Sequence, residues 1–321
     1  MIYFYYGDDT FRAKETIWQL KDKFIKLYDP SSNNVDFIDG DEFSLERFFT
    51  VVKAQGFLAK KKFVIVKNIF SVKKFSDIQD LLIDYLKTQK NSKEENYIIF
   101  WQEGVPKQNL KLFKYLSKLC TPLKCCKNFE PMKQSQLITW IQNQVTRSDK
   151  NITKDAAELL ISLVGDNTWH LYHEIQKLCN YSSKENITAD DIQDIIQKMH
   201  ADTIFTLMDA MSARQKERAL ALLEDYFQRE TDRQYLLNMI FRQFRLIFLT
   251  KAARETTNNS YAIAQRLKLH PFVAKKMLQH SSNFGNAELE SIYKNLIALD
   301  SINKSDPAYI ETALTLFVAR L

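Results

Sequence analysis

The residues that could bind a nucleotide follow the first apolar segment of the chain. Gly7 opens the run Gly-Asp-Asp-Thr-Phe-Arg-Ala-Lys, where a strand-to-helix turn would carry a phosphate loop. That loop has the pattern G-x-x-x-x-G-K-[ST], but Arg12 stands at its second glycine and Lys14 lies beyond the position of its lysine. Without that glycine the backbone cannot wrap a phosphate, and the carboxylates of Asp8 and Asp9 would repel one. We therefore expect Gly7, Asp8, Asp9, Arg12 and Lys14 to form a degenerate nucleotide loop.

A nucleotide-hydrolysing site also needs acidic side chains at the end of a neighbouring strand, where they hold Mg²⁺ and align water. The apolar segment Phe63–Val66 runs instead into Lys67 and Asn68. The loss of both the loop and the acids predicts a fold kept for assembly, with no catalytic residue, no metal and no cofactor. An unrelated α/β protein that never bound a nucleotide is the alternative that these residues leave open.

The cysteines and histidines give no sign of a metal site or a disulfide. We expect reduced, buried thiols, because no CxxC pair occurs among Cys120, Cys125, Cys126 and Cys179. His170 and His173 share one face of an expected helix, but no HExxH pattern or third ligand accompanies them. We interpret both as surface histidines.

An alternation of strands and helices must position the residues of the loop. Apolar segments rich in β-branched and aromatic residues predict strands, and amphipathic segments predict helices. The expected strands are Ile2–Tyr6, Val35–Ile38, Phe63–Val66, Tyr97–Trp101 and Leu123–Lys127. The expected helices are Thr10–Ile25, Leu45–Ala54, Asp77–Leu86 and Leu110–Leu119. Several strands are apolar on both faces, so residues 1–134 are expected to form a doubly wound, parallel-sheet α/β domain.

The rest of the chain shows the spacing of amphipathic helices and no further strand signals. Thr153 and Thr188 stand where helix N-caps belong, and Gly165-Asp166-Asn167 separates two helices. An apolar stripe along Tyr235–Ala252 is wide enough for an intramolecular core or for packing against other subunits. We expect an all-α remainder made of a small helical domain and a second helical domain, residues 135–209 and 210–321.

The bulk composition restricts the class of protein. The chain has 321 residues and 45% hydrophobic content, enough for more than one core. No apolar run approaches the ~20 residues that cross a bilayer, and the N-terminus lacks the features of a secretory signal. We therefore expect a cytoplasmic protein with no membrane partner. The net charge of +6 suits contact with DNA or an acidic protein, and equally a solvated surface.

Short motifs in a fixed order are spread over nearly the whole chain. They are Tyr5–Phe11, Val35–Asp41, Gly56–Val66, Leu137–Ile141, Glu174–Leu178, Phe241–Arg245, His270–Lys276 and the pair Asp300 and Lys304. In these motifs and in their order, the sequence resembles the delta-subunit family of the bacterial DNA polymerase III clamp loader. The Ser-Arg-Cys motif that supplies an arginine finger in other loader subunits is absent from the sequence, in agreement with this resemblance.

The resemblance implies a domain organisation and a set of partners. The domains would be a AAA+-like clamp-binding domain without Walker motifs, a helical lid and a helical collar for oligomerisation, over residues 1–134, 135–209 and 210–321. The partners would be the sliding β clamp, the delta-prime and gamma/tau subunits of a heteropentamer, and primed DNA reached through the complex. ATP binding by the neighbours would expose the clamp-binding helix, and delta would open the clamp. The chain by itself would not be an enzyme, although it would serve a nucleotidyltransferase, the DNA-directed DNA polymerase holoenzyme.

The segment that resembles the family's clamp-binding site follows the helix for which Ser44 is the expected N-cap. Phe57 and Leu58 would anchor it in a clamp pocket, with Gln55 and Gly56 flanking them. The family commonly has Leu-Phe at this place, whereas this chain has the inverted order Phe57-Leu58. Lysines follow directly, so at least one of the two side chains is expected to be exposed. The alternative is that Phe57 caps the core beneath the sheet.

Other function classes compete with the clamp-loader hypothesis. A nucleotide-dependent ATPase or kinase with a degenerate loop would bind nucleotide. A clamp-independent, DNA-binding helical regulator on a degenerate AAA+ scaffold would bind DNA through its basic helical region. Copurification with the clamp separates this regulator from a delta subunit.

Overall fold

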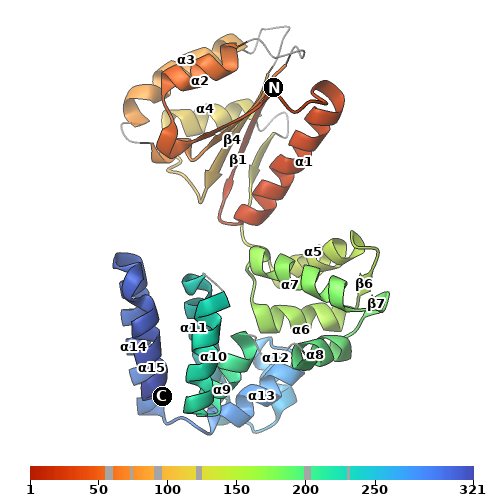
Figure 1. Cartoon of the computed structure of the whole chain (residues 1–321), viewed down its shortest axis with the longest axis vertical. Helices are drawn as coiled ribbons and strands as arrows, with labels where there is room; N and C mark the ends of the chain where they lie inside the picture. The colour runs from red at the N-terminus through yellow and green to blue at the C-terminus, as the bar shows by residue number, and fades with distance from the viewer. Residues whose placement is uncertain (55–60, 73–74, 90–95, 121–124, 199–203, 230–231) are drawn as a thin grey trace. The chain divides into compact units, whose positions relative to one another are not determined.

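The structure is a computed structural model, and it describes residues 1–54, 61–72, 75–89, 96–120, 125–198, 204–229 and 232–321. These residues form two compact units, residues 1–132 and 133–321 (Figure 1). Each unit has hydrophobic clusters of its own. The division of the second unit into a lid and a collar stays a prediction.

The first unit is built on a parallel sheet with the strand order β2-β3-β4-β1-β5. Its strands are β1 (Ile2–Gly7), β2 (Val35–Asp39), β3 (Phe63–Lys67), β4 (Tyr97–Glu103) and β5 (Cys126–Asn128). Phe4 of β1 pairs with Phe100 of β4 on one side and with Cys126 of β5 on the other. Because neighbouring strands are parallel, their carboxyl ends meet at one edge, where the segments after β1 and β3 lie.

Helices cover both faces of this sheet, as the apolar strands predict (Figure 1). One face carries α1 (Thr10–Tyr28), and the other carries α2 (Leu45–Lys53), α3 (Phe75–Gln89) and α4 (Lys111–Cys120). Successive residues of β3 alternate between the two cores: Phe63 and Ile65 pack under α1, whereas Val64 and Val66 pack on the other side. Short 3₁₀ turns complete this unit at Gly40–Glu42 and Ile69–Ser71. The doubly wound α/β fold expected for this part of the chain is confirmed.

The second unit consists almost entirely of helices. Its elements are α5 (Gln134–Thr146), β6 (Asn151–Ile152), α6 (Lys154–Val164), α7 (Thr168–Tyr181), β7 (Asn186–Ile187), α8 (Ala189–Lys198), α9 (Ile204–Ser212), α10 (Lys216–Arg229), α11 (Arg233–Arg254), α12 (Ser260–Leu267), α13 (Pro271–Ser281), α14 (Asn286–Ser305), a 3₁₀ turn (Pro307–Tyr309) and α15 (Ile310–Arg320). α11 packs against both α13 and α14, and Phe244 in its middle is fully buried against Phe284 and Phe317. Most of the stripe along α11 is therefore intramolecular core.

Polar side chains start the helices where the sequence places them. The Ser44 hydroxyl accepts a hydrogen bond from the Arg47 amide at 3.1 Å, and the Thr153 hydroxyl accepts one from the Ala156 amide at 3.2 Å. Both hydroxyls satisfy amides that lack a partner within their helix. The predicted N-caps of α2 and α6 are confirmed.

The expectation of an all-helical remainder was wrong in one detail. β6 and β7 pair in parallel, with Ile152 opposite Ile187, and both side chains are buried. Strands of two residues show no alternation of apolar and polar positions, so the sequence pattern could not reveal them. Among the described residues, no helix combines the length and apolar character needed to cross a membrane.

Candidate functional site

The turn after β1 is closely packed against the chain that follows β5. Gly7 has a φ of +129°, and a Cβ atom built on it would lie 2.5 Å from the carbonyl oxygen of Phe129. The Phe129 amide donates to the Tyr6 carbonyl at 2.7 Å, and the Phe129 carbonyl accepts from the Asp9 amide at 2.9 Å. The chain that follows β5 therefore runs against the loop itself.

Asp9 occupies the N-terminus of α1, where a phosphate would sit in a nucleotide-binding loop. Its Oδ1 accepts from the Arg12 amide at 3.1 Å, and its Oδ2 lies 2.6 Å from Arg12 Nε. The side chain of Asp9 is almost fully buried, while that of Arg12 is partly exposed. The carboxylate thus supplies the negative charge that this helix end favours.

Two further residues of the predicted loop lie elsewhere. Asp8 is exposed. Lys14 lies within α1, with its ammonium group 5.4 Å from the ring centroid of Trp18. The structure therefore brings Gly7, Asp9 and Arg12 together. Asp8 is exposed to solvent, and the Lys14 side chain lies near Trp18.

The end of β3 carries a basic side chain, as the sequence indicates. Lys67 forms an ion pair with Glu103 at 3.1 Å, and its ammonium group lies 5.1 Å from the ring centroid of Trp101. Asn68 adopts a left-handed conformation, and its amide exchanges hydrogen bonds of 3.0 Å with the side chain and backbone of Glu103. Lys67 and Asn68, which stand where a nucleotide-hydrolysing site would have acidic residues, therefore both bind Glu103. Among the described residues, no cluster of three His, Cys, Asp or Glu side chains could hold a metal ion.

The predicted clamp-binding segment, Gln55, Gly56, Phe57 and Leu58, lies outside the described residues. On one side of it α2 ends at Lys53, and on the other Lys62 forms an ion pair with Asp36 at 3.0 Å. Of the neighbouring aromatic residues, Phe48 is fully buried in the core. Phe49 and Phe70 are only partly buried, and Phe49 packs on Tyr85 with ring centroids 5.2 Å apart.

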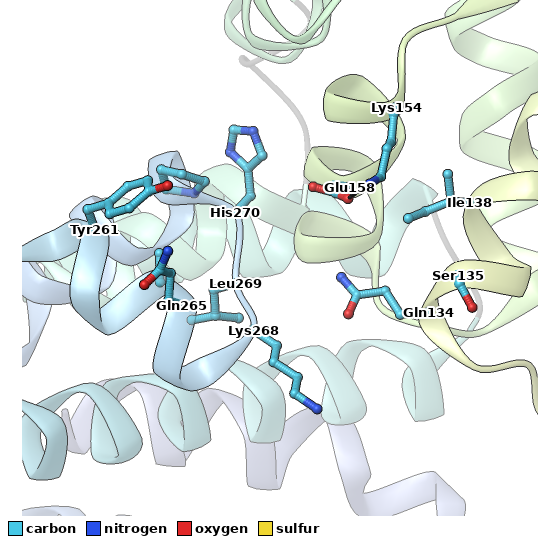
Figure 2. Close-up of a pocket in the computed structure, with 12 residues that line it drawn as sticks. Gln134, Ser135, Ile138, Lys154, Glu158, Tyr261, Gln265, Lys268, Leu269 and His270 are labelled. Atoms are coloured by element: carbon cyan, nitrogen blue, oxygen red, sulfur yellow. Dashed lines mark ion pairs between the residues drawn. The ribbon is translucent and has the colours of Figure 1, made fainter.

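The second unit contains a cavity of about 410 Å³ (Figure 2). Gln134 and Glu158 line one side of it, and Tyr261 and Gln265 line the opposite side. Glu158 is paired with Lys154 at 3.7 Å. These side chains offer no converging set of acids, bases or nucleophiles, so we assign no chemistry to the cavity.

His270 lies at the edge of this cavity and links α13 to α6. Its Nδ1 accepts from the Phe272 amide at 3.2 Å, which caps α13, and its Nε2 lies 3.0 Å from the Asp155 carboxylate. Its backbone amide donates to the Ser162 hydroxyl at 3.1 Å. The first residue of the motif His270–Lys276 therefore holds α13 against α6.

Arg242 contacts the same end of α6 from α11. Its Nη2 donates to the carbonyls of Ile161 at 3.2 Å and Ser162 at 2.7 Å. Burial lowers the pKa of the guanidinium, and the nearby carboxylate of Asp166 opposes that shift. A cation at the carboxyl end of a helix is favoured by the helix dipole. Sequence reasoning did not find this contact, although an arginine within a broad apolar stripe was a signal for it.

The two histidines differ in their exposure. His170 is only partly exposed: it stacks on Tyr235 of α11 with ring centroids 3.6 Å apart, and burial lowers its pKa. The stacking partner lies far away in the sequence, so the local pattern could not reveal it. His173 is exposed, as expected.

Three of the four cysteines are buried, as the sequence predicts. Cys120, Cys125 and Cys179 are buried, and Cys126 is partly exposed. Burial raises the pKa of the Cys120 thiol to about 12, so this group is a poor nucleophile at neutral pH.

The strand order, the helices on both faces and the occupied loop define the class of protein. It is a AAA+-like protein in which the Asp9 side chain caps the helix that follows the first strand. Family models extend this assignment: that of the DNA polymerase III delta subunit matches residues 3–126, and that of the C-terminal domain of the delta subunit matches residues 201–321. The chain belongs to the DNA polymerase III delta subunit family, whose members are components of the clamp loader.

Individual relatives agree with this family. The chain is 25% identical to DNA polymerase III subunit delta of Bacillus subtilis, over 100% of this chain and 92% of that one. It is 22% identical to a probable DNA polymerase III subunit delta of Aquifex aeolicus, over 70% of this chain and 63% of that one. The solved DNA clamp loader delta protein of Bacillus subtilis has a similar fold, with a TM-score of 0.52 and 24% identity over 99% of this chain and 94% of that one.

Proposed function

We propose that this protein binds the ring-shaped sliding β clamp and opens it, within a heteropentamer that also contains delta-prime and gamma/tau subunits. The observation that carries the proposal is the AAA+-like sheet whose loop is filled by Asp9, Arg12 and the backbone of Phe129. An ATPase-like fold with a degenerate phosphate-binding loop supports a role in binding and assembly. Membership of the delta family supports the clamp as the protein that is bound.

In this proposal the chain hydrolyses no ATP, and its neighbours in the ring do. Their ATP binding exposes the clamp-binding segment, the clamp opens at one interface, and hydrolysis on primed DNA releases it. Residues 1–134 carry the clamp-binding segment, residues 135–209 form the lid and residues 210–321 form the collar that joins the ring. Phe248 and Ile297 support the last assignment, because these large apolar side chains remain 40% and 64% exposed on α11 and α14.

The clamp anchor in this proposal is Phe57 with Leu58, flanked by Gln55 and Gly56. Each anchor side chain buried in a clamp pocket would contribute about 1.5–3 kcal/mol. Loss of both should weaken clamp binding on the order of 10²–10⁴-fold. Because exposed anchors contribute little to the fold, the double variant should keep its stability and its assembly with the other subunits.

The test is the variant Phe57→Ala/Leu58→Ala, measured for binding to immobilised clamp and for thermal unfolding. The matched control is Leu27→Ala/Phe37→Ala, which removes the same residue types from exposed positions of the same unit. If Phe57 instead lies in the core, the double variant should lose melting temperature through a cavity. A folded double variant with wild-type affinity for the clamp would refute the anchor assignment. Binding to DNA but never to the clamp would favour the clamp-independent regulator.

A further inference from the structure

The last residues of the first unit are fastened to the loop after β1. Beyond β5, the Phe129 amide donates to Tyr6 and the Phe129 carbonyl accepts from Asp9, at 2.7 and 2.9 Å. The Phe129 ring is buried and meets the Tyr5 ring edge-on, with centroids 5.7 Å apart. The segment therefore continues the path of β5 along β1 up to the helix end that Asp9 caps.

Arg12 binds both sides of this junction. Its Nε pairs with the Asp9 carboxylate at 2.6 Å, and its Nη2 donates to the backbone carbonyl of Glu130. The Glu130 side chain is held in turn, because its Oε1 accepts from Asn128 Nδ2 at 2.8 Å. The planar guanidinium can make these two contacts at once, whereas a lysine ammonium lacks the fork of donors.

This arrangement replaces a ligand with the chain's own groups. In a phosphate loop, the amides at the start of the helix bind the phosphates of the nucleotide. Here Asp9 satisfies the helix start and Arg12 completes the link, with Gly7 allowing the close approach of Phe129. The link is therefore made by groups of the chain itself.

A few residues further along the chain, a hydrogen bond at the start of α5 fixes the first residue of the second unit. The Lys133 amide donates to the Gln136 side chain at 3.0 Å, which fixes Lys133 to the start of α5. The boundary between the two units falls between Met132 and Lys133. Pro131 and Met132 are thus the residues between two fastened ends.

We propose that Arg12 is a positioning residue which fastens the exit of the first unit, so that rotation between the units is confined to Pro131 and Met132 and does not depend on nucleotide. The altered phosphate loop has then acquired a mechanical role. If the first unit binds the clamp, as the proposed function has it, this fastening would let it move as a rigid body up to Glu130.

Residue-resolved hydrogen exchange on the full chain tests this proposal. In the wild type, the amides of Asp9 and Phe129 should exchange slowly, that of Met132 should exchange fast, and added ATP with Mg²⁺ should change none of them. Arg12→Met removes charge-assisted hydrogen bonds, so exchange at Asp9 and Phe129 should rise about 10- to 100-fold. Exchange at Ile65 in the core should stay unchanged, which separates a local release from general destabilisation.

Two further variants keep the test decisive. Lys23→Met removes the same charge from an exposed position of α1 and should behave like the wild type. Arg12→Lys keeps the charge without the fork and should give an intermediate rate, and it carries the test if Arg12→Met fails to fold. Wild-type exchange at Phe129 in a folded Arg12→Met chain would overturn the proposal. Slower exchange at Asp9 on addition of ATP would overturn it as well.

Discussion

At the scale of single residues, Gly7 shows how tightly the loop after β1 is packed. Replacement by alanine would force a side chain into a φ of +129° and bring its Cβ within 2.5 Å of the Phe129 carbonyl oxygen. We expect Gly7→Ala to lower the free energy of unfolding by about 1–3 kcal/mol. Gly285→Ala is the control, because nothing lies within 4 Å of that position. Urea unfolding curves compare them, and equal losses in the two variants would contradict the packing argument.

The same loop leads to a second prediction at this scale. The isolated chain should release no phosphate from ATP, even with clamp and primed DNA, because Asp9 occupies the helix end and Lys14 lies against Trp18. A steady-state phosphate-release assay measures this rate. Turnover that survives further purification and disappears in Lys14→Ala would refute the prediction.

At the scale of elements, the start of α8 predicts a pH dependence. Hydrogen bonds from Lys184 and then from Thr188 lower the pKa of Asp191 to about 2. A lowered pKa means that the carboxylate stabilises the fold above its ordinary pKa of 3.8, and that this contribution is lost as the pH falls toward about 2. The stability of the second unit should therefore decrease between about pH 4 and pH 2.

The variant Asp191→Asn tests this pH dependence. Because the amide cannot titrate, the acid-induced loss of stability should become shallower over that pH range. At neutral pH the variant should cost about 0.5–2 kcal/mol, since the reciprocal hydrogen bonds with Thr188 are weakened. Asp190→Asn, at an exposed neighbouring carboxylate, is the control. Identical acid-unfolding curves for both variants would count against the assignment.

At the scale of the whole molecule, Arg242 connects helices far apart in the sequence. Arg242→Met would leave the partly buried Ser162 carbonyl without this donor, while the Ile161 carbonyl keeps its bond from the Gly165 amide, so we expect a loss of about 1–3 kcal/mol. Faster hydrogen exchange in the last turn of α6 should accompany that loss. Arg245→Met removes the same charge from an exposed position of α11 and should cost little. An α6 that exchanges at the wild-type rate in Arg242→Met would show that the contact is unimportant.

The division into two compact units predicts which fragment of the chain folds by itself. Residues 133–321 pack as one unit, and α6 contacts both α11 and α13, so removal of residues 210–321 alone would strip α6 of these partners. We expect the fragment 1–132 to fold by itself and, under the proposed function, to bind the clamp without entering the loader. Size-exclusion chromatography with the clamp or with the other loader proteins measures both properties. Entry of this fragment into the pentamer would show that the assembly interface lies in the first unit.

The sequence alone determined the features that depend on neighbours along the chain. Continuous apolar segments predicted the strands of a covered parallel sheet, because each such strand is buried on both faces. Ser44 and Thr153 predicted helix starts, because a cap binds an amide only a few residues away. The sequence also predicted a degenerate phosphate loop, since that motif depends on residue types at fixed spacing from Gly7.

Tertiary structure decided what fills the loop and how the helices of the second unit are held together. Arg12 reaches Glu130, 118 residues away in the chain, and Arg242 reaches Ser162 across 80 residues. Such contacts depend on where whole elements pack, so no local periodicity or spacing encodes them. The same reason explains why the pairing of β6 with β7, and the stacking of His170 on Tyr235, emerged only once the chain was folded.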